Sequence, residues 1–477
     1  NNLSNEGIIA LDGLLQNLGS ISGTILMNGT SNTDAYIGVL QNLEISTTGT
    51  VRAADHGSVS RLLKINSGAT FDTNGKNIVL ESDANQTALV HHNGGNTLGD
   101  FEVQRHISTG NGHHFISAPT NNASIQELAD DFPLNLSGGS PHVYYYDETN
   151  TATTAAMRWR APASLSHPME AGEGFTFWFN TNGGKTIDIN GPINNGTVPI
   201  PMTFTHSIPV SSNTNGPYSP EGWNFIGNPY AAPIDYNAMI AAAPSAVAHG
   251  MYRWDPNTST YISYINGISN PANYNAIIPS MQGFWLRTSA NCTLNLDNSM
   301  RVTDPDIVSS IFLKNSNNDP ISRLELSGLG KKIETVLTFN QYANNSFDPQ
   351  LDAYFLPSDE SDEIILASKI GQHTLSINSL GDLGASNHLI PLHFKVSTAG
   401  TYSIQISEFT NFPAGTILIL EDQQLSTSQI LNQGLYQFVG SPNDNENRFR
   451  LNVVPDANSI NSVENKEAIK VYTQLDD

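Results

Sequence analysis

The chain has 477 residues, a formal net charge of −23 at neutral pH and one cysteine, Cys292. Phosphate recognition needs clustered lysine and arginine, so this acidic balance argues against nucleic acid and against an anionic membrane surface as partners. The single cysteine excludes an internal disulfide framework and a cysteine-based metal site. No apolar run approaches the roughly 18 residues of a membrane span, so we expect no transmembrane segment.

The composition favours strands over helices. Hydrophobic residues make up 38% of the chain and charged residues 14%. This mixture is too apolar for a disordered tail and too poor in charge for a helix-rich enzyme. The abundant Asn and Gly favour turns, whereas Thr, Ile, Val, Tyr and Phe suit pleated surfaces. We therefore expect an all-β protein of about three domains, built from many short strands.

Residues 1–100 carry short apolar triplets that recur along the chain. The triplets at 43–45 and 63–65 are each followed closely by a glycine, and a further triplet stands at 78–80. A recurrence of roughly 15 to 20 residues suits the rungs of a short parallel β-helix, which we predict for this part. A β-sandwich with loose hairpins is the alternative.

Residues 101–300 form a predicted β-sandwich region that contains a tandem repeat of roughly 109 residues, with copies at 101–197 and 198–300. Each copy has a Phe-Ile-x-x-Pro strand, an aromatic strand, and a second aromatic strand that follows a glycine. The sequence leaves open whether the copies are two halves of one domain or consecutive domains. The matched segments are 112–119 with 222–229, 144–147 with 252–255, and 174–178 with 283–286.

Each copy also predicts one short helix after its first strand. Ser124 and Glu127 have the spacing of a capping box, in which the hydroxyl and the carboxylate each bond an unpaired backbone N–H. In the second copy, Asp235 is placed to cap a helix at 236–242, which Pro244 then ends.

Residues 302–455 show the period of strands with one buried face. Tyr402, Ile404 and Ile406 are separated by polar residues, and 416–420 is a continuous run suited to a strand covered on both faces. About eight strands in this stretch predict a β-sandwich of jelly-roll or immunoglobulin-like type. Residues 456–467 are polar and are predicted to be a linker.

The motifs of familiar enzyme classes do not occur in the sequence. We find no zinc-protease, nucleophile-elbow, phosphate-loop or dinucleotide motif, and no local pattern marks a carboxylate pair. The histidine pairs 91–92 and 113–114 would point to opposite faces of a strand, which disfavours a shared metal. The acidic run 359–363 and the pair Asp304 and Asp306 offer ligands for structural calcium, although solvated charge explains them more simply. We predict no catalytic residue and, apart from this calcium, no cofactor.

Aromatic residues are dense in the repeat region and have two interpretations. Exposed rings stack on sugars, so Trp159, Tyr145 and Tyr230 are candidate contacts for a glycan or protein ligand. Most aromatic positions are filled in both copies, however, as a common core requires. Core packing is therefore the preferred interpretation.

The motif Gly-Trp-Asn-Phe-Ile-Gly-Asn-Pro-Tyr at 222–230, with Gly-Phe-Trp at 283–285, resembles large secreted surface proteins of the Bacteroidetes. The unit at 302–455 resembles the sandwich that often precedes their C-terminal sorting sequence. The tail at 469–473 is similar to the opening of a type IX secretion sorting domain, so we expect 456–477 to be a linker and the start of that domain. Further residues that carry the resemblance are 347–348, 352–354, 399–402 and 447–449.

The resemblance implies export by the type IX secretion system, followed by display on the outer-membrane surface or release. It implies contact with the type IX translocon and with its outer-membrane β-barrel shuttle protein, and it carries over no catalytic residue. The leading hypothesis is thus a non-catalytic adhesin or structural stalk. The rival is an accessory region, glycan-binding or spacer, of a secreted polysaccharide-degrading enzyme whose catalytic domain lies outside this chain.

Overall fold

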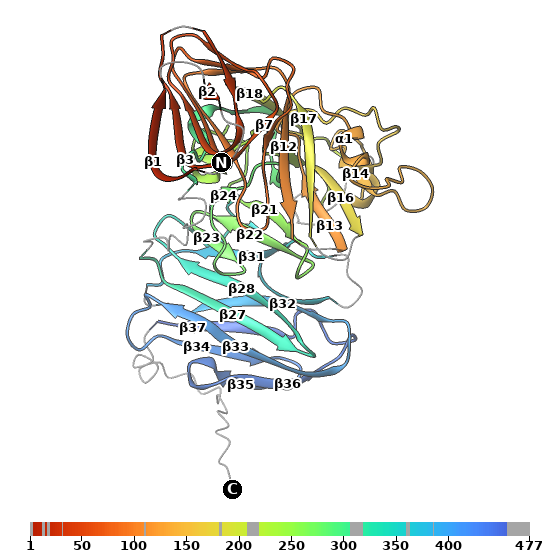
Figure 1. The fold of residues 1–477 in the computed structure, drawn as a ribbon. Coiled ribbons are helices and arrows are strands. Elements are labelled where there is room, and N and C mark those ends of the chain that lie inside the picture. Colours follow the sequence, from red (N-terminus) through yellow and green to blue (C-terminus); the bar gives the residue numbers. More distant parts are fainter. Residues whose placement is uncertain are drawn as a thin grey trace.

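Strands make up nearly all of the regular secondary structure in the computed structural model, which describes residues 3–11, 15–16, 20–30, 32–108, 111–180, 184–207, 219–305, 318–358, 363–384 and 386–455. The prediction of an all-β protein is confirmed. Three parts follow one another along the chain: two parallel sheets, a middle part with two similar halves, and a large mixed sheet (Figure 1). None of the described helices is long and apolar enough to cross a membrane.

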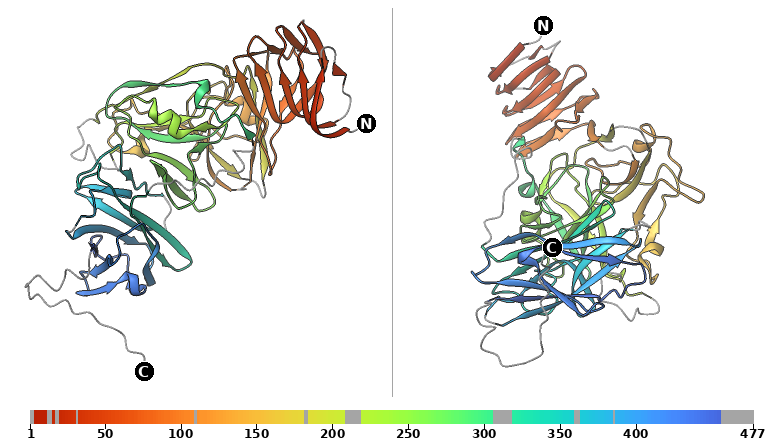
Figure 2. Two further views of the ribbon diagram at one scale, coloured as in Figure 1. Left: turned by 90° about the vertical axis from the view of Figure 1, so that its left-hand side faces the viewer. Right: turned by 90° about the horizontal axis from the view of Figure 1, so that it is seen from below.

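Successive strands from β1 to β9 alternate between two sheets, in which they pair in parallel, and lie at one end of the molecule (Figure 2). The triplets at 43–45 and 63–65 lie in neighbouring strands, with Leu43 opposite Leu63 and Ile45 opposite Ile65. All four side chains are fully buried. The equal phase of the triplets keeps them on the inner face, because a one-residue slip would turn them outward.

The first sheet contains β1 (Leu3–Leu11), β3 (Ser20–Met27), β5 (Gly38–Ile45), β7 (Gly57–Asn66), β9 (Ile78–Leu80), β10 (Leu89–Asn93), β12 (Phe101–Ile107) and β17 (Lys185–Gly191). The second contains β2 (Leu15–Gln16), β4 (Thr33–Tyr36), β6 (Thr50–Ala53), β8 (Thr70–Asp72) and β11 (Asn96–Leu98).

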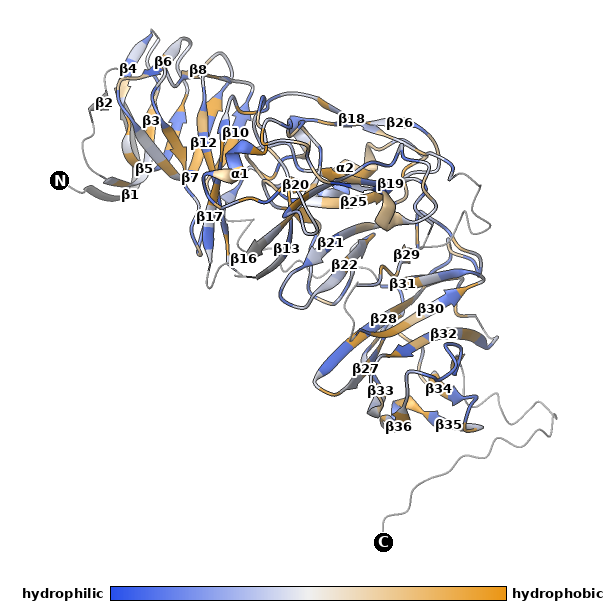
Figure 3. Ribbon diagram, turned by 90° about the vertical axis from the view of Figure 1, so that its right-hand side faces the viewer, coloured by the Kyte–Doolittle hydropathy of each residue, from blue (hydrophilic) through white to orange (hydrophobic). Residues whose placement is uncertain are grey.

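Strand β12 belongs to two parts of the molecule at once. It pairs in parallel with β9 and antiparallel with β17, the last strand of the first repeat copy. Strands β7 and β12 both carry apolar residues (Figure 3). Buried residues of the N-terminal part and of the first repeat copy form one continuous hydrophobic core. A sheet and a core therefore run without a break across residue 100, where the sequence suggested a boundary.

The two repeat copies have the same strand pairing. The sheet of the first copy has the order β13-β16-β14-β15, and that of the second has the matching order β19-β25-β21-β22, extended by β23. The first copy contains β13 (Asn111–Ile116), α1 (Gln126–Ala129), β14 (Val143–Tyr146), η1 (Ala155–Arg158), β15 (Trp159–Arg160) and β16 (Phe175–Asn180). The second contains β18 (Val198–Met202), β19 (Trp223–Gly227), β20 (Ile234–Asp235), α2 (Tyr236–Ala241), β21 (Met251–Asp255), β22 (Thr260–Ile265), β23 (Ile268–Asn270), β24 (Ile277–Ile278), β25 (Gly283–Arg287), β26 (Cys292–Leu296) and η2 (Asn298–Met300).

The two copies pack against each other through reciprocal contacts. Ile116 of the first copy bridges Gln282 of the second, and Ile226, the equivalent of Ile116, bridges Glu173, the equivalent of Gln282. Reciprocal contacts of this kind are the mark of an approximate two-fold arrangement. The two copies are therefore two halves that pack together, which answers the question that the sequence left open. We call the interface between the two halves the seam.

The glycine before each aromatic strand is required by this seam. A Cβ atom on Gly174 would lie 2.7 Å from the carbonyl oxygen of Ile226, and one on Gly283 would lie 3.0 Å from that of Ile116. The two backbones therefore approach each other closely at both places, and only glycine, which has no Cβ atom, fits there.

The C-terminal part is one large mixed sheet of strands β27 to β37. Tyr402 and Ile404 are buried in β33, and Leu418 and Leu420 of the continuous run are buried in β34. Its elements are β27 (Ile321–Gly328), β28 (Lys331–Phe339), β29 (Ala353–Tyr354), β30 (Ile364–Ile370), β31 (His373–Leu380), β32 (His388–Val396), β33 (Gly400–Thr410), β34 (Ile417–Asp422), β35 (Thr427–Ile430), η3 (Leu431–Gln433), β36 (Tyr436–Gly440) and β37 (Phe449–Val454).

One of the two helix predictions is confirmed and the other needs a correction. Asp235 caps α2 by accepting a hydrogen bond from Asn237 N at 2.8 Å. Helix α1 forms, but no side chain caps it, so the predicted capping box of Ser124 is wrong. The Glu127 carboxylate instead accepts a hydrogen bond from Asn190 N of β17 at 3.0 Å. The Glu127 carboxylate thus bonds β17, a strand distant in the sequence, and does not bond the backbone at the start of its own helix.

Candidate functional site

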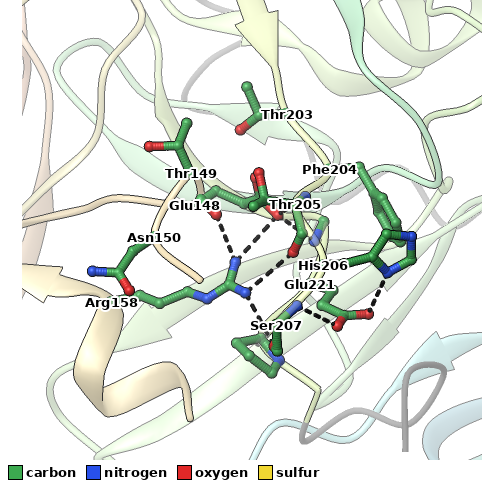
Figure 4. A network of polar contacts seen from close by, with 12 residues as sticks. Glu148, Thr149, Asn150, Arg158, Thr203, Phe204, Thr205, His206, Ser207 and Glu221 are labelled. Carbon is green, nitrogen blue, oxygen red and sulfur yellow. Dashed lines mark hydrogen bonds and ion pairs between the residues drawn. The ribbon is translucent and has the colours of Figure 1, made fainter. Parts of the chain in front are cut away.

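A buried polar network ties the loop after β14 to the segment that connects the two copies (Figure 4). Arg158 has no exposed surface. Its Nη1 donates to the carbonyl oxygen of Glu148 at 2.6 Å and to Oε1 of the same residue at 3.3 Å. Its Nη2 donates to the carbonyl oxygen of Thr205 and to the hydroxyl of Ser207, at 3.2 and 3.3 Å.

Two buried glutamates hold backbone N–H groups of the same segment. Glu148 Oε1 accepts from Thr205 N at 2.7 Å and from Gly222 N at 2.8 Å. Glu221 Oε1 accepts from Ser207 N at 2.8 Å. These donors would otherwise be buried without partners, so the network acts as a clamp on the seam. Neither glutamate lines the cleft described below, and the pair does not have the access that a catalytic pair requires.

An aromatic cluster fills the interior of the seam. The equivalent residues Phe115 and Phe225 meet edge to face, with ring centroids 4.7 Å apart. Phe225 stacks on Trp285 at 4.7 Å, and Trp159 meets the edge of Trp285 at 5.5 Å. Aromatic pairs of this geometry stabilise a core beyond the area that they bury. The cluster also includes Tyr146, Trp223, Tyr252, Trp254 and Tyr261.

The three predicted ligand contacts lie in packing positions. Trp159 is a partly buried member of the aromatic cluster. Tyr145 is partly buried and stacks on His167, with ring centroids 4.8 Å apart. Tyr230 is 0% exposed, and its hydroxyl donates to the carbonyl oxygen of Gly196 at 2.7 Å. Tyr230 thus presents no surface to a ligand, and its predicted role is corrected to one in the core.

Buried hydrogen bonds join the middle part to the C-terminal part. Tyr354 N donates to the hydroxyl of Tyr252 at 2.7 Å. Asn270 Nδ2 donates to the carbonyl oxygens of Glu334 and Ser376, at 2.8 and 3.0 Å. The aromatic cluster continues across the same boundary through Tyr354 and apolar residues of β31. This junction is therefore sealed by both polar and apolar contacts.

A cleft of about 740 Å³ opens beside the junction and has walls from both parts. Phe204 and Arg287 line it from the middle part, and Phe347, Tyr354 and His373 line it from the C-terminal part. Phe347 stacks on His373 with ring centroids 4.2 Å apart. Within the described part of the chain no carboxylate lines this cleft, so it suits a polar ligand that is neutral or negatively charged.

The described ranges contain no group of three His, Cys, Asp or Glu residues able to hold a metal ion.

His92 is buried, with Nδ1 2.8 Å from Arg301 Nη1 and Nε2 3.1 Å from Thr97 Oγ1. Burial lowers the pKa of His92 to about 3, so the ring is neutral and Nδ1 accepts from the guanidinium. Of the predicted calcium ligands, Asp306 and residues 359–362 lie outside the described residues, as does the predicted linker at 456–467 with the tail that follows it.

A family model described as "Domain of unknown function (DUF8693)" matches residues 21–453. The chain belongs to this family. The match runs through all three parts of the chain. No curated protein and no solved structure matches the chain. The family description gives no activity, and the function has to be argued from the geometry.

Sequence reasoning missed the clamp of this DUF8693 member. Nothing in the local sequence marks Glu148 or Glu221, and Arg158 directly precedes Trp159, the residue that drew attention instead. The one available signal is the scarcity of charge, because charged residues make up only 14% of the chain.

Proposed function

We propose that this chain is a non-catalytic, rigid segment of a secreted or cell-surface protein, either an adhesin or a structural stalk. The observation that carries the proposal is the sealing of both boundaries between its parts. Strand β12 is shared across the first, and the buried bonds of Tyr252 and Asn270 cross the second. Relative motion is the usual expectation for neighbouring domains, unless their interface is large and apolar. Parts joined by such contacts within the described residues suit a spacer that holds a binding region away from a surface.

The proposal includes finer assignments of fold and location. We assign the alternating parallel strands to a short β-helix, and the middle and C-terminal parts to β-sandwiches, the last of jelly-roll or immunoglobulin-like type. The resemblance of 222–230 and of the tail to Bacteroidetes surface proteins supports type IX export to the outside of the cell. The partners are then the translocon and its shuttle protein.

Surface exposure in the source organism tests this location. Intact cells are treated with protease and probed with an antibody against the chain, in the wild type and in a strain without the type IX translocon. The proposal expects cleavage at the surface or release into the medium in the wild type, and intracellular retention in the other strain. Equal export by both strains contradicts it.

The cleft favours a second candidate, the glycan-binding accessory region of a polysaccharide-degrading enzyme. Its walls carry aromatic and hydroxyl side chains, which are the types of side chain that bind sugars. Phe347→Ala should weaken binding on a glycan array about tenfold or more if the cleft binds sugar. Leu425→Ala changes an exposed apolar residue that does not line the cleft and is the control. Absence of any glycan bound by the unaltered chain would contradict the glycan-binding candidate.

A further inference from the structure

A second cavity, of about 200 Å³, lies between the end of β12, the strand β13 and the turn after β21. Its lining includes Arg105, His114, Phe115, Trp254 and Gln282. This volume is below the roughly 300 to 1,000 Å³ of pockets for drug-sized ligands, so it admits only a small group. The stalk proposed above needs no ligand here, so this cavity calls for a separate explanation.

Arg105 brings a positive charge to this cavity without a negative partner. Its Nη1 donates to the carbonyl oxygen of Ser280 at 2.9 Å, and its Nη2 donates to Gln282 Oε1 at 2.7 Å. Both acceptors are neutral. Among the described residues no carboxylate pairs with Arg105, and none lines the cavity. A guanidinium has five N–H donors, and these two bonds use two of them.

The surroundings of Arg105 make a negatively charged partner favourable. Burial, with a smaller contribution from Arg253, lowers the pKa of Arg105 to about 10. Arg105 is partly buried, and a cation in such surroundings is commonly paired with an acid. None of the residues that line this cavity is acidic, so the charge of Arg105 is not compensated within the lining.

We propose that this cavity binds a small carboxylate, held by Arg105 through charge-assisted hydrogen bonds. Trp254 supplies a further donor, because its indole Nε1 is buried and has no hydrogen-bond partner within the described residues. Guanidinium and carboxylate match in planar geometry, so two parallel bonds can form. The carboxylate belongs either to a free organic acid or to a uronic acid unit of an acidic glycan.

Isothermal titration calorimetry on the full chain at low salt tests this site, with sodium glucuronate, sodium acetate and neutral glucose as probes. Saturable binding of glucuronate that exceeds that of acetate supports the glycan source, and equal binding of both supports the free acid. Binding should weaken as salt is added, since the attraction is electrostatic. Saturable binding of glucose as tight as that of glucuronate, or no binding of either anion, overturns the proposal.

Matched variants locate the site. Arg105→Gln keeps a donor toward Ser280 but removes the charge, and affinity for the anion should fall about tenfold or more. Trp254→Phe keeps the ring and removes one donor, so a smaller loss is expected. Trp285→Phe removes an equally unpartnered indole N–H outside the cavity lining and should leave affinity unchanged. Melting temperature shows whether each variant folds, and unchanged affinity in a folded Arg105→Gln protein overturns the proposal.

Discussion

Arg158 and Glu148 show how much of this fold depends on single buried charges. Glu148→Ala would leave the buried Arg158 guanidinium without its carboxylate partner, and the N–H groups of Thr205 and Gly222 without an acceptor. We expect the free energy of unfolding to fall by about 3–5 kcal/mol, measured by urea denaturation. The control is Arg52→Ala, which breaks an exposed 3.9 Å pair with Asp72 and should cost less than about 1 kcal/mol. Losses of similar size in both variants would contradict the clamp.

Gly174 tests the close approach of the two halves at the seam. In Gly174→Ala the new methyl group would meet the Ile226 carbonyl at 2.7 Å, so strand β16 or β19 must shift. Overpacking of this kind should lower stability by about 1–3 kcal/mol, read from thermal melting. Gly139→Ala places a methyl group in open space and is the matched control. An unchanged melting temperature in Gly174→Ala would show that the seam is looser than described.

His92 gives the junction of the first two parts a pH dependence. Its pKa is about 3 in the folded state and about 6.5 in an unfolded chain, so the unfolded state binds the proton first as pH falls. The stability that depends on neutral His92 is therefore complete above about pH 6.5 and is lost progressively toward pH 3. His92→Asn keeps an acceptor for Arg301 that does not titrate. Urea midpoints at pH 7 and 5 should differ less in His92→Asn than in the unaltered chain, and equal differences would refute this.

A buried acid acts in the opposite direction and makes the comparison of variants necessary. Burial raises the pKa of Asp352 to about 7, so this carboxyl contributes stability at low pH that is lost as pH rises from about 4 to 7. The total pH profile mixes both effects. Only the difference between two proteins that share Asp352 isolates the contribution of His92.

At the scale of elements, helix α2 depends on its cap and α1 does not. Asp235→Ala removes the acceptor for Asn237 N and should cost about 1 kcal/mol in thermal denaturation. Ser124→Ala occupies the corresponding place before α1, where no side chain caps the helix, and should be close to neutral. Equal losses from the two substitutions would mean that the cap assignment is mistaken.

The elements that the sequence predicted are those whose signals are local. The triplets at 43–45 and 63–65, the alternation around Ile404 and the cap of α2 each lie within a few residues and appear where expected. The capping box of α1 was also local, but Glu127 bonds Asn190, which is 63 residues away. The clamp rests on pairs such as Glu148 and Gly222, which are 74 residues apart. No local pattern encodes such contacts, because they exist only once the two halves have met.

At the scale of the whole molecule, three parts that the sequence presented as successive units are joined by contacts across both of their boundaries. One boundary is bridged by a shared sheet and core, and the other by buried hydrogen bonds and a continuous aromatic cluster. The family match, which spans residues 21–453, fits a single inherited unit. This rigidity is what connects the fold to the proposed role as a spacer, since a stalk must fix the distance between its ends.

Single-molecule energy transfer across each junction tests this rigidity most directly. In a Cys292→Ser background, dyes are attached at the exposed positions Ala84 and Ala163 for the first junction, and at Ala163 and Gln423 for the second. We predict one narrow transfer-efficiency peak for each pair, without exchange between states. A broad peak or several interconverting peaks for either pair would show independent domains, and would contradict the account of a rigid stalk.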